Sequence, residues 1–236
     1  MAAALVATGE NRQASAPRKR RASAPKGGSL TEHAYQLIKE RIISAKYVPG
    51  QFLQEARICA DLKLGRTPVH QALHRLHQEG LLDIIPRKGI LIRTESLAEI
   101  FMALEARMLI EPYFAEQCAE RASTAEMAEI ESLMAQYRKL QKDGDKAPMM
   151  EVDRRFHAAI AQVGGNSLLV EFLRPIQERM SRMWFLPHWQ ARDYSVTEAE
   201  HDKLMQALKS RDGKAAADAM REHIESLRRR IMSAKI

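Results

Sequence analysis

Four side chains in the C-terminal half of the sequence have the types and the spacing of a metal site. Asp153 and His157 are four residues apart, so both lie on one face of the helix predicted there. His201 and His223 fall in two later predicted helices. One carboxylate and three imidazoles suit a borderline divalent ion, zinc first, with nickel and manganese as alternatives, and leave positions free for water or a ligand. A divalent metal cofactor is therefore one interpretation of these residue types.

The same residues also have a plainer interpretation. A histidine on a helix is more often a surface, capping or hydrogen-bonded core residue than a metal ligand. Sequence spacing does not show that the three helices meet. On spacing alone, both interpretations remain open.

These residues belong to a long helical region. From about residue 97 onwards the apolar residues repeat with a helical period, and no alternating strand pattern occurs. Ser123 or Thr124 would cap the second helix, Pro148 would open the third, and Asn166 or Ser167 would start the fourth. We therefore expect an all-helical bundle, with helices at about residues 97–121, 124–142, 147–163, 167–186, 195–211 and 213–233.

A second chemical pattern lies upstream, within residues 65–89. Pro68 stands in what should be the first turn of a helix, where proline costs no hydrogen bond. Val69, Leu73 and Leu76 then repeat at helical spacing and form a core-facing stripe. The opposite face presents side chains that can form hydrogen bonds with an outside partner, namely His70, Gln71, His74 and Arg75.

The neighbouring segments supply the setting for that helix. Thr31 is the predicted N-cap of a helix that runs to about Lys46, and a second helix at about 55–63 leads into a turn at residues 64–65. Gly80 ends the helix that has Pro68 in its first turn, and residues 81–85 and 90–93 then flank a turn, as in a β-hairpin. Two short helices joined by a glycine-containing turn and followed by a basic-tipped hairpin predict a winged helix-turn-helix that binds DNA.

The side chains suggest particular DNA contacts. Arg66, at the helix entrance, suits a phosphate or guanine O6 and N7, whereas Gln71 can pair with adenine and Arg75 with a base or the backbone. The basic wing tip most simply neutralises phosphate, and its glycine lets the turn approach closely. A solvated surface role is the alternative for each charged residue. The predicted DNA-binding residues are Arg66, Thr67, His70, Gln71, Arg75, Arg87, Lys88 and Gly89.

Charge is distributed as this interpretation requires. Residues 1–93 hold sixteen Lys and Arg against seven Asp and Glu, a balance of +9, whereas residues 94–236 hold twenty-one against twenty-three, a balance of −2. The basic excess is therefore confined to the part predicted to bind DNA.

Length and composition set further bounds. The 236 residues suit two modest domains, and the two cysteines, Cys59 and Cys118, favour reduced thiols in a cytoplasmic protein over a disulfide framework. No apolar run approaches the roughly 20 residues that cross a membrane. We expect a disordered basic arm at 1–28, a DNA-binding domain at 29–93, a linker at 94–98 and a helical ligand-binding domain at 99–236. The cluster at residues 18–21 would add non-specific DNA affinity or only solubility.

The N-terminal motifs resemble the GntR family of bacterial repressors. The resemblance spans roughly residues 30–93, with motifs in the expected order at Pro49–Leu53, Ala60–Leu62, Arg66–Val69, Ala72–Leu73, Arg75–Leu76 and Glu79–Leu81. Such proteins usually carry Arg-Glu where this chain has His70 and Gln71, and often serine or threonine in place of Gly65. Both departures fall on or beside the base-reading surface, so the operator sequence does not carry over from relatives.

The C-terminal motifs resemble the FCD effector domain of the FadR-type branch of that family. This resemblance covers nearly all of residues 97–233, through Glu105–Pro112, Asp153–His157, Gly165–Leu168, Glu200–His201 and Ala219–His223. In the metal-containing members an aspartate, the histidine four residues later and two histidines of the last two helices hold the ion. The resemblance thus implies that the metal ligands are Asp153, His157, His201 and His223.

The resemblance also implies a ligand contact for Arg107. The corresponding arginine can contact a small carboxylate whose oxygens also bind the metal, and a guanidinium suits such a carboxylate. An ion pair with Glu105, Glu111 or another acid is the alternative. Trp184, His188 and Trp189 lie near a proline break and could line the pocket, although core packing suits the tryptophans better.

Together these patterns predict a regulator and not an enzyme. A homodimer would bind a palindromic operator and repress transcription until a small carboxylic acid enters the bundle, with Thr94–Ala98 as the hinge. An activator, or a regulator whose metal is purely structural, is the alternative. A metal-dependent hydrolase or decarboxylase would leave the DNA-binding module unexplained, and a nucleoid-type protein would show little operator preference.

Overall fold

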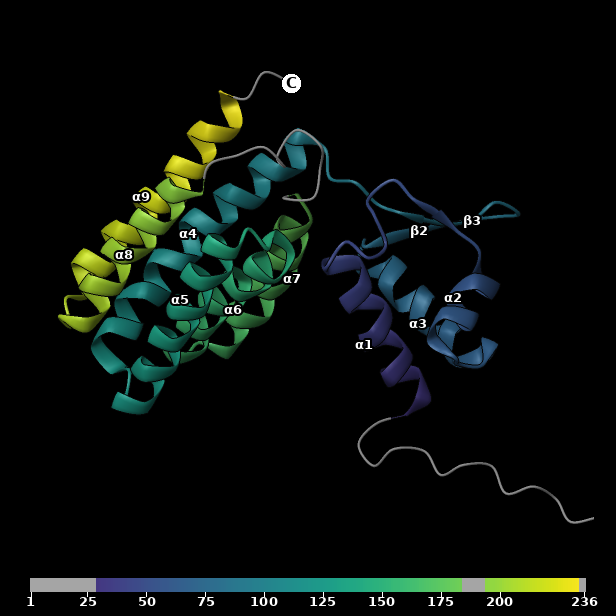
Figure 1. Ribbon diagram of the computed structural model, residues 1–236, viewed down its shortest axis with the longest axis horizontal. Coiled ribbons are helices and arrows are strands. Elements are labelled where there is room, and N and C mark those ends of the chain that lie inside the picture. Colours follow the sequence, from purple (N-terminus) through teal and green to yellow (C-terminus); the bar gives the residue numbers. More distant parts are fainter. Residues whose placement is uncertain (1–28, 184–193, 234–236) are drawn as a thin grey trace, which may run out of the picture.

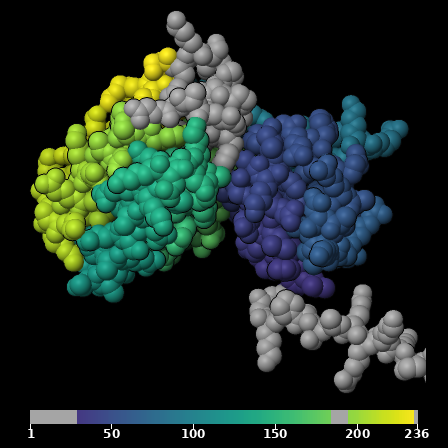
Figure 2. All heavy atoms as spheres, viewed as in Figure 1, coloured from purple at the N-terminus to yellow at the C-terminus, as the bar shows by residue number. Residues whose placement is uncertain are grey.

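The computed structural model describes residues 29–183 and 194–233. Within these residues the chain forms nine helices and three short strands, so the predicted mainly helical fold is confirmed. Two separate clusters of buried apolar side chains divide it into a smaller N-terminal unit and a larger helical bundle, which lie side by side (Figure 1 and Figure 2).

The N-terminal unit is a winged helix-turn-helix. It comprises α1 (Leu30–Ile43), β1 (Phe52–Leu53), α2 (Glu55–Leu62), α3 (Arg66–Gln78), β2 (Leu82–Ile85) and β3 (Gly89–Ile92). The strands are antiparallel in the order β1-β3-β2, with Leu82 opposite Ile92. Val69, Leu73 and Leu76 of α3 are buried in a core shared with α1, as their spacing predicts, and the other face of α3 is exposed.

The start and end of α1 differ from the prediction. Ser29, and not Thr31, caps the helix, because the Ser29 hydroxyl accepts a hydrogen bond from the backbone N–H of Glu32 (3.2 Å). The helix also ends before the predicted Lys46, and Ala45 adopts a left-handed conformation with φ of 53°. Strand β1 is absent from the prediction, since two residues are too short to show an alternating pattern.

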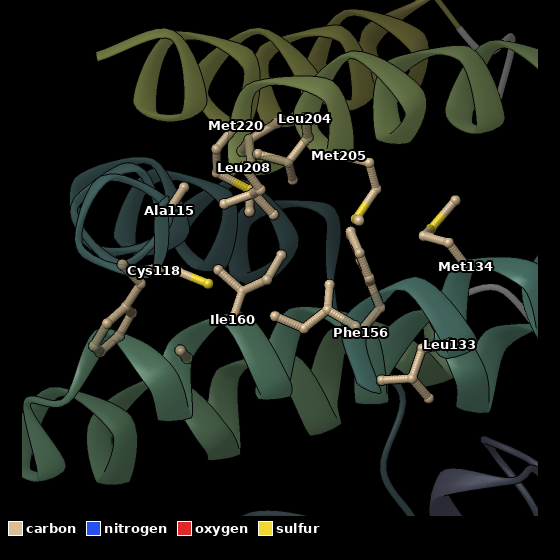
Figure 3. Close-up of a cluster of buried hydrophobic side chains, with 14 of the residues drawn as sticks. Ala115, Cys118, Leu133, Met134, Phe156, Ile160, Leu204, Met205, Leu208 and Met220 are labelled. Atoms are coloured by element: carbon tan, nitrogen blue, oxygen red, sulfur yellow. The ribbon is translucent and has the colours of Figure 1, made fainter. Parts of the chain in front are cut away.

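The bundle contains all six predicted helices. They are α4 (Leu97–Arg121), α5 (Thr124–Asp143), α6 (Lys146–Gly164), α7 (Ser167–Met183), α8 (Ser195–Lys209) and α9 (Gly213–Met232). Capping boxes begin two of them, Ser96 with Glu99 at α4 and Ser123 with Glu126 at α5. In the bundle core, Phe156 and Ile160 point from α6 towards the apolar side chains of α8 (Figure 3). The predicted end of the fourth helix, at residue 186, lies outside the described residues.

One buried arginine joins the two units. Arg182 of α7 donates hydrogen bonds to the carbonyl oxygens of Leu81 (3.2 Å) and Arg93 (3.3 Å) and forms an ion pair with Glu95. Burial lowers the pKa of Arg182 to about 10, with repulsion from Arg93 adding to the effect, so the guanidinium remains charged at neutral pH. No helix among the described residues has the length and apolar character needed to cross a membrane.

Candidate metal centre and nucleic-acid interface

Three helices bring the three predicted histidine ligands together inside the bundle. His157 of α6, His201 of α8 and His223 of α9 are all buried, and each offers a ring nitrogen within 4.8 Å of the nitrogens of the other two. Their ring centroids are 4.7 to 5.5 Å apart. The sequence left open whether these helices converge, and in the structure they do.

Several ring nitrogens of this cluster lack hydrogen-bond partners. Nε2 of His157 and both ring nitrogens of His201 are buried without one. Such orphaned polar atoms are costly in a protein interior. The other nitrogen of His157, Nδ1, donates to Glu111 Oε2 at 2.8 Å, and Nδ1 of His223 donates to Glu200 Oε2 at 2.9 Å. Because a carboxylate can only accept, Nδ1 of each ring carries a proton, and in the neutral ring the free lone pair is then on Nε2.

Burial keeps two of the three imidazoles, those of His201 and His223, in the neutral form. Burial lowers the pKa of His201 well below its ordinary value, and the positive potential of His223 and His157 lowers it further. Burial likewise lowers the pKa of His223, despite its bond to Glu200. Neutral imidazoles are the form that coordinates a metal ion.

Asp153, the fourth predicted ligand, lies at the edge of the cluster and is not one of the three residues whose ligand atoms all lie within 4.8 Å of one another. Its Oδ1 lies 3.5 Å from Nε2 of His201, and its side chain is partly exposed. Ligand atoms bound to one tetrahedral zinc ion lie about 3.3 Å from one another, given bonds of about 2.0–2.1 Å. The donor types and the unpartnered nitrogens fit a divalent ion, so this buried histidine cluster could hold a metal.

Glu111 of α4 connects the histidine cluster to two further buried side chains. It accepts hydrogen bonds from His157, from Arg107 Nε (2.6 Å) and from Gln177 Nε2 (3.2 Å). Burial alone would raise the pKa of Glu111, but Arg107 and His157 hold it well below its ordinary value. Sequence reasoning identified Glu111 only as a possible ion-pair partner of Arg107 and missed Gln177, because no local pattern links α4 to α7.

Arg107 therefore forms an ion pair with Glu111, which is the alternative to ligand binding considered from the sequence. It also faces a small cavity beside His223, of about 20 Å³, which is enough for one water molecule. Asp153, Thr197 and Arg230 line the same cavity. Trp184, His188 and Trp189, which the sequence places near the pocket, lie outside the described residues, as does the basic cluster at 18–21.

The outer face of α3 carries the predicted DNA-reading side chains. Arg66, Thr67, His70, Gln71 and Arg75 are all exposed. The structure places these polar groups on one continuous surface of the N-terminal unit, the face opposite the core stripe.

Acidic neighbours engage several of these side chains. Glu55 of α2 pairs with Arg66 Nε at 2.9 Å and with His70 Nδ1 at 3.0 Å, and sequence reasoning missed it. Arg75 pairs with Glu32 at 2.8 Å and lies over the ring of Tyr35, 3.6 Å from its centroid. These contacts are exposed ion pairs that engage the basic groups in the absence of DNA.

The wing projects its two basic residues from the β2–β3 turn. Arg87 and Lys88 are exposed at the tip, and Arg87 has a φ of 63°. Gly89 has a φ of 112°, and a Cβ there would lie 2.6 Å from the carbonyl oxygen of Leu53. This close approach is internal to the wing, so the structure gives Gly89 a packing role that sequence reasoning did not foresee.

Comparisons with known proteins agree with this architecture. The model described as "Bacterial regulatory proteins, gntR family" matches residues 30–92, and the FCD domain model matches residues 102–226. The Uxu operon transcriptional regulator of Escherichia coli K12 is 28% identical over 88% of this chain and 90% of its own length. The galactonate operon transcriptional repressor of the same organism is 26% identical, over 85% and 96% respectively.

Solved structures show the same fold. Escherichia coli McbR/YncC aligns with a TM-score of 0.78 at 20% identity, covering 87% of this chain and 98% of that one. A GntR regulator from Rhodococcus sp. RHA1 aligns with a TM-score of 0.75 at 19% identity, covering 87% and 99%. The relatives matched by sequence are transcriptional regulators and not enzymes, as the sequence predicted. The chain belongs to the GntR family of bacterial transcriptional regulators, with an FCD domain following its DNA-binding domain.

Proposed function

We propose that this protein is a repressor that releases its operator when a small carboxylate binds at a metal-containing pocket in the FCD domain. The observation that carries the proposal is the set of buried imidazoles with unpartnered nitrogens, which Arg107 approaches through Glu111. The protein acts in the cytoplasm, as a homodimer whose two α3 helices enter successive major-groove segments of a palindromic operator.

Asp153, His157, His201 and His223 hold the ion, with zinc as the first choice for this donor set. When bound there, the ion would act as a Lewis acid towards carboxylate oxygens. Glu111 and Glu200 fix the orientation of two of the imidazoles. Arg107 pairs with Glu111 through Nε and Nη2, so its Nη1 remains to orient the effector carboxylate.

Helix α7 provides a physical connection from this site to the DNA-binding unit. Gln177 contacts Glu111, which contacts His157. The next residue of α7, Glu178, forms an ion pair with Lys39 of α1, with 2.8 Å between Oε2 and Nζ. Arg182 donates a hydrogen bond to the carbonyl oxygen of Arg93, in the segment between the two units. An effector that favours a different position of α7 would change how the DNA-binding units are held, provided that it binds the two arrangements with unequal affinity.

Metal content tests the site. Mass spectrometry of the purified native chain should find about one equivalent of a divalent ion. The His157→Ala, His201→Ala double variant should lose it, and His74→Ala, which changes an exposed histidine of α3, should keep it. Absence of metal from the native chain, even after divalent ions are supplied, would make the histidines structural.

Operator binding tests the regulation. An operator selected from random DNA can be titrated by fluorescence anisotropy with and without small hydroxycarboxylates, galactonate among them because a relative regulates a galactonate operon. At least one acid should weaken binding of the native chain but not of the double histidine variant. A reporter gene then separates a repressor from an activator, and equal affinity for operator and random DNA would indicate a nucleoid-type protein.

Two further outcomes would assign the metal centre a different role. If the metal stabilises the fold while none of the acids changes operator affinity, the ion is purely structural. Turnover of any of the acids by the purified chain would indicate a metal-dependent enzyme.

A further inference from the structure

The first turn of α1 reaches the outer face of α3. The two helices lie side by side in the N-terminal unit and share its core (Figure 1). Outside that core, the Thr31 hydroxyl donates a hydrogen bond to Oε1 of Gln71 at 2.6 Å. The next residue of α1, Glu32, accepts a hydrogen bond from Nη1 of Arg75 at 2.8 Å. Two successive residues of α1 thus hold two side chains of the face that is proposed to meet DNA.

These two contacts differ in what they leave for a DNA partner. All five N–H groups of Arg75 are donors, so its ion pair with Glu32 does not change the kind of group that it presents. The amide of Gln71 has a carbonyl oxygen at one end and an NH2 group at the other. Rotation by a half turn about the last bond of the side chain exchanges these ends. The end that faces the operator therefore decides whether Gln71 donates or accepts a hydrogen bond.

The surroundings of Thr31 select one orientation of the Gln71 amide. Because the hydroxyl donates to Oε1, the oxygen end of the amide is turned towards α1. The free N–H groups in the first turn of a helix carry a positive potential, which also favours a carbonyl oxygen there over an NH2 group. Nε2 of Gln71 has no hydrogen-bond partner in the described part of the chain, and the residue is exposed. Both of its N–H groups therefore remain for an outside acceptor.

An outward NH2 group matches one kind of base edge. In the major groove guanine presents two acceptors, O6 and N7, whereas adenine presents one acceptor and one donor. The pair with adenine that the sequence suggests uses both ends of the Gln71 amide, and the Thr31 hydroxyl already occupies one lone pair of Oε1. A contact with guanine needs only the NH2 group. The orientation of the amide therefore favours guanine.

We propose that Thr31 is a positioning residue that presents Gln71 to the operator as a hydrogen-bond donor, so that this position of α3 reads guanine and not adenine. The hydrogen bond is exposed, and water would satisfy both groups in its absence. The contact thus serves orientation and adds little to stability. The inference rests on the proposed contact between α3 and the operator, and it names a residue outside α3 that sets what one position of α3 reads.

Single-base discrimination by the full chain tests this role. Sites selected from random DNA by the native chain and by Gln71→Ala identify the base pair whose preference depends on Gln71. Two duplexes that carry guanine or adenine at that base pair are then titrated by fluorescence anisotropy. The native chain should prefer guanine about tenfold, and Gln71→Ala should bind both duplexes equally.

Variants of Thr31 separate positioning from a structural role. Thr31→Val, which removes the hydroxyl but keeps the shape, should lower the preference for guanine about fivefold or more, and Thr31→Ser should retain it. In the Gln71→Ala background, Thr31→Val should have no further effect, because the two residues act as one unit. Thr124→Val, at an exposed threonine in the first turn of α5, is the matched control and should behave like the native chain. The urea midpoint should be unchanged in all variants.

The outcomes distinguish the role of Thr31 from the proposed DNA contact itself. A native preference for adenine at this base pair, or full preference for guanine in Thr31→Val, would overturn the inference. An equal loss of affinity for both duplexes in Thr31→Val would also overturn it, because that loss indicates a structural role. If Gln71→Ala selects the same sites as the native chain, Gln71 reads no base, and the proposed contact fails together with the inference.

Discussion

Glu55 contacts two of the side chains that are predicted to meet DNA, and it therefore competes with phosphate and bases for them. Its ion pair with Arg66 is exposed on the arginine side, where 87% of the side chain is accessible. Exposed ion pairs contribute about 0–1 kcal/mol. A DNA backbone that brings several phosphates can therefore displace Glu55 easily.

We expect Arg66→Ala to weaken operator binding about tenfold or more, measured by anisotropy over a range of salt concentrations. If Arg66 contacts a phosphate, the slope of log affinity against log salt concentration should decrease in magnitude by about 1. If it contacts guanine, the variant should lose sequence preference at one base pair of the operator. Glu55→Gln is the control, since it keeps Arg66 and removes the competing carboxylate, and it should bind at least as tightly as the native chain. Native affinity in Arg66→Ala would refute the assignment.

The two cysteines should differ in reactivity. Cys118 lies in the bundle core, and burial raises its pKa to about 11, whereas Cys59 of α2 is half-buried. At pH 8 only about one Cys118 thiol in a thousand is ionised, and the thiolate is the reactive form. Iodoacetamide should label Cys59 in the native protein at pH 8, and Cys118 only after unfolding in urea. Rapid labelling of both thiols in the native state would contradict the buried position of Cys118.

The residue types were sufficient to propose the metal ligands, but they did not predict which side chains surround them. The spacing of Asp153 and His157 put them on one helix face, whereas the approach of His201 and His223 depends on how α8 and α9 pack. Gln177 and its bond to Glu111 had no signal at all, because two residues 66 positions apart form no local pattern. Contacts of this kind are set by tertiary packing.

At the level of elements, helices and strands were predicted correctly where the local sequence pattern was long and clear. The six bundle helices have long apolar periods and clear caps, such as Ser123 with Glu126, and their starts agree with the structure to within a residue. The cap of α1 was misassigned because Ser29 and Thr31 are both good caps, and only the three-dimensional structure shows that Thr31 donates instead to Gln71 (2.6 Å). Strand β1 owes its existence to pairing with β3.

The wing depends on a glycine that no other residue can replace without strain. Gly89→Ala would adopt an unfavourable φ and also place its Cβ against the backbone oxygen of Leu53. We expect a loss of about 1–3 kcal/mol in the free energy of unfolding, measured by urea denaturation, together with weaker operator binding. Gly144→Ala is the matched control, because its φ of 73° is also positive but nothing lies within 4 Å of the added Cβ. If the two variants lose equal stability, the contact with Leu53 is unimportant.

At the scale of the whole molecule, helix α7 is the element through which an acid bound in the bundle could change the DNA affinity of the N-terminal unit. The two units have separate cores, so rearranging one against the other need not disturb either. Helix α7 spans the gap, since Gln177 faces the candidate metal centre while Glu178 and Arg179 face the DNA-binding unit. Arg179 donates to the carbonyl oxygen of Glu79 at 3.2 Å, beside the end of α3.

Arg182 is the most demanding of these contacts, because its fully buried guanidinium holds Glu95 and the carbonyl oxygens of Leu81 and Arg93. Removing one partner of a buried pair costs about 3–5 kcal/mol. Arg182→Met keeps the apolar stem but removes these contacts between the two units. We therefore expect trypsin to cleave after Arg93 about tenfold faster in this variant, because the segment opens more often. The metal content should be unchanged. Operator affinity in this variant should no longer respond to the effector, because the arrangement of the units would not depend on α7. Arg174→Met, at an exposed position of the same helix, should behave like the native chain. If Arg182→Met is cleaved no faster than Arg174→Met, the units are held by other contacts, and the connection through α7 fails.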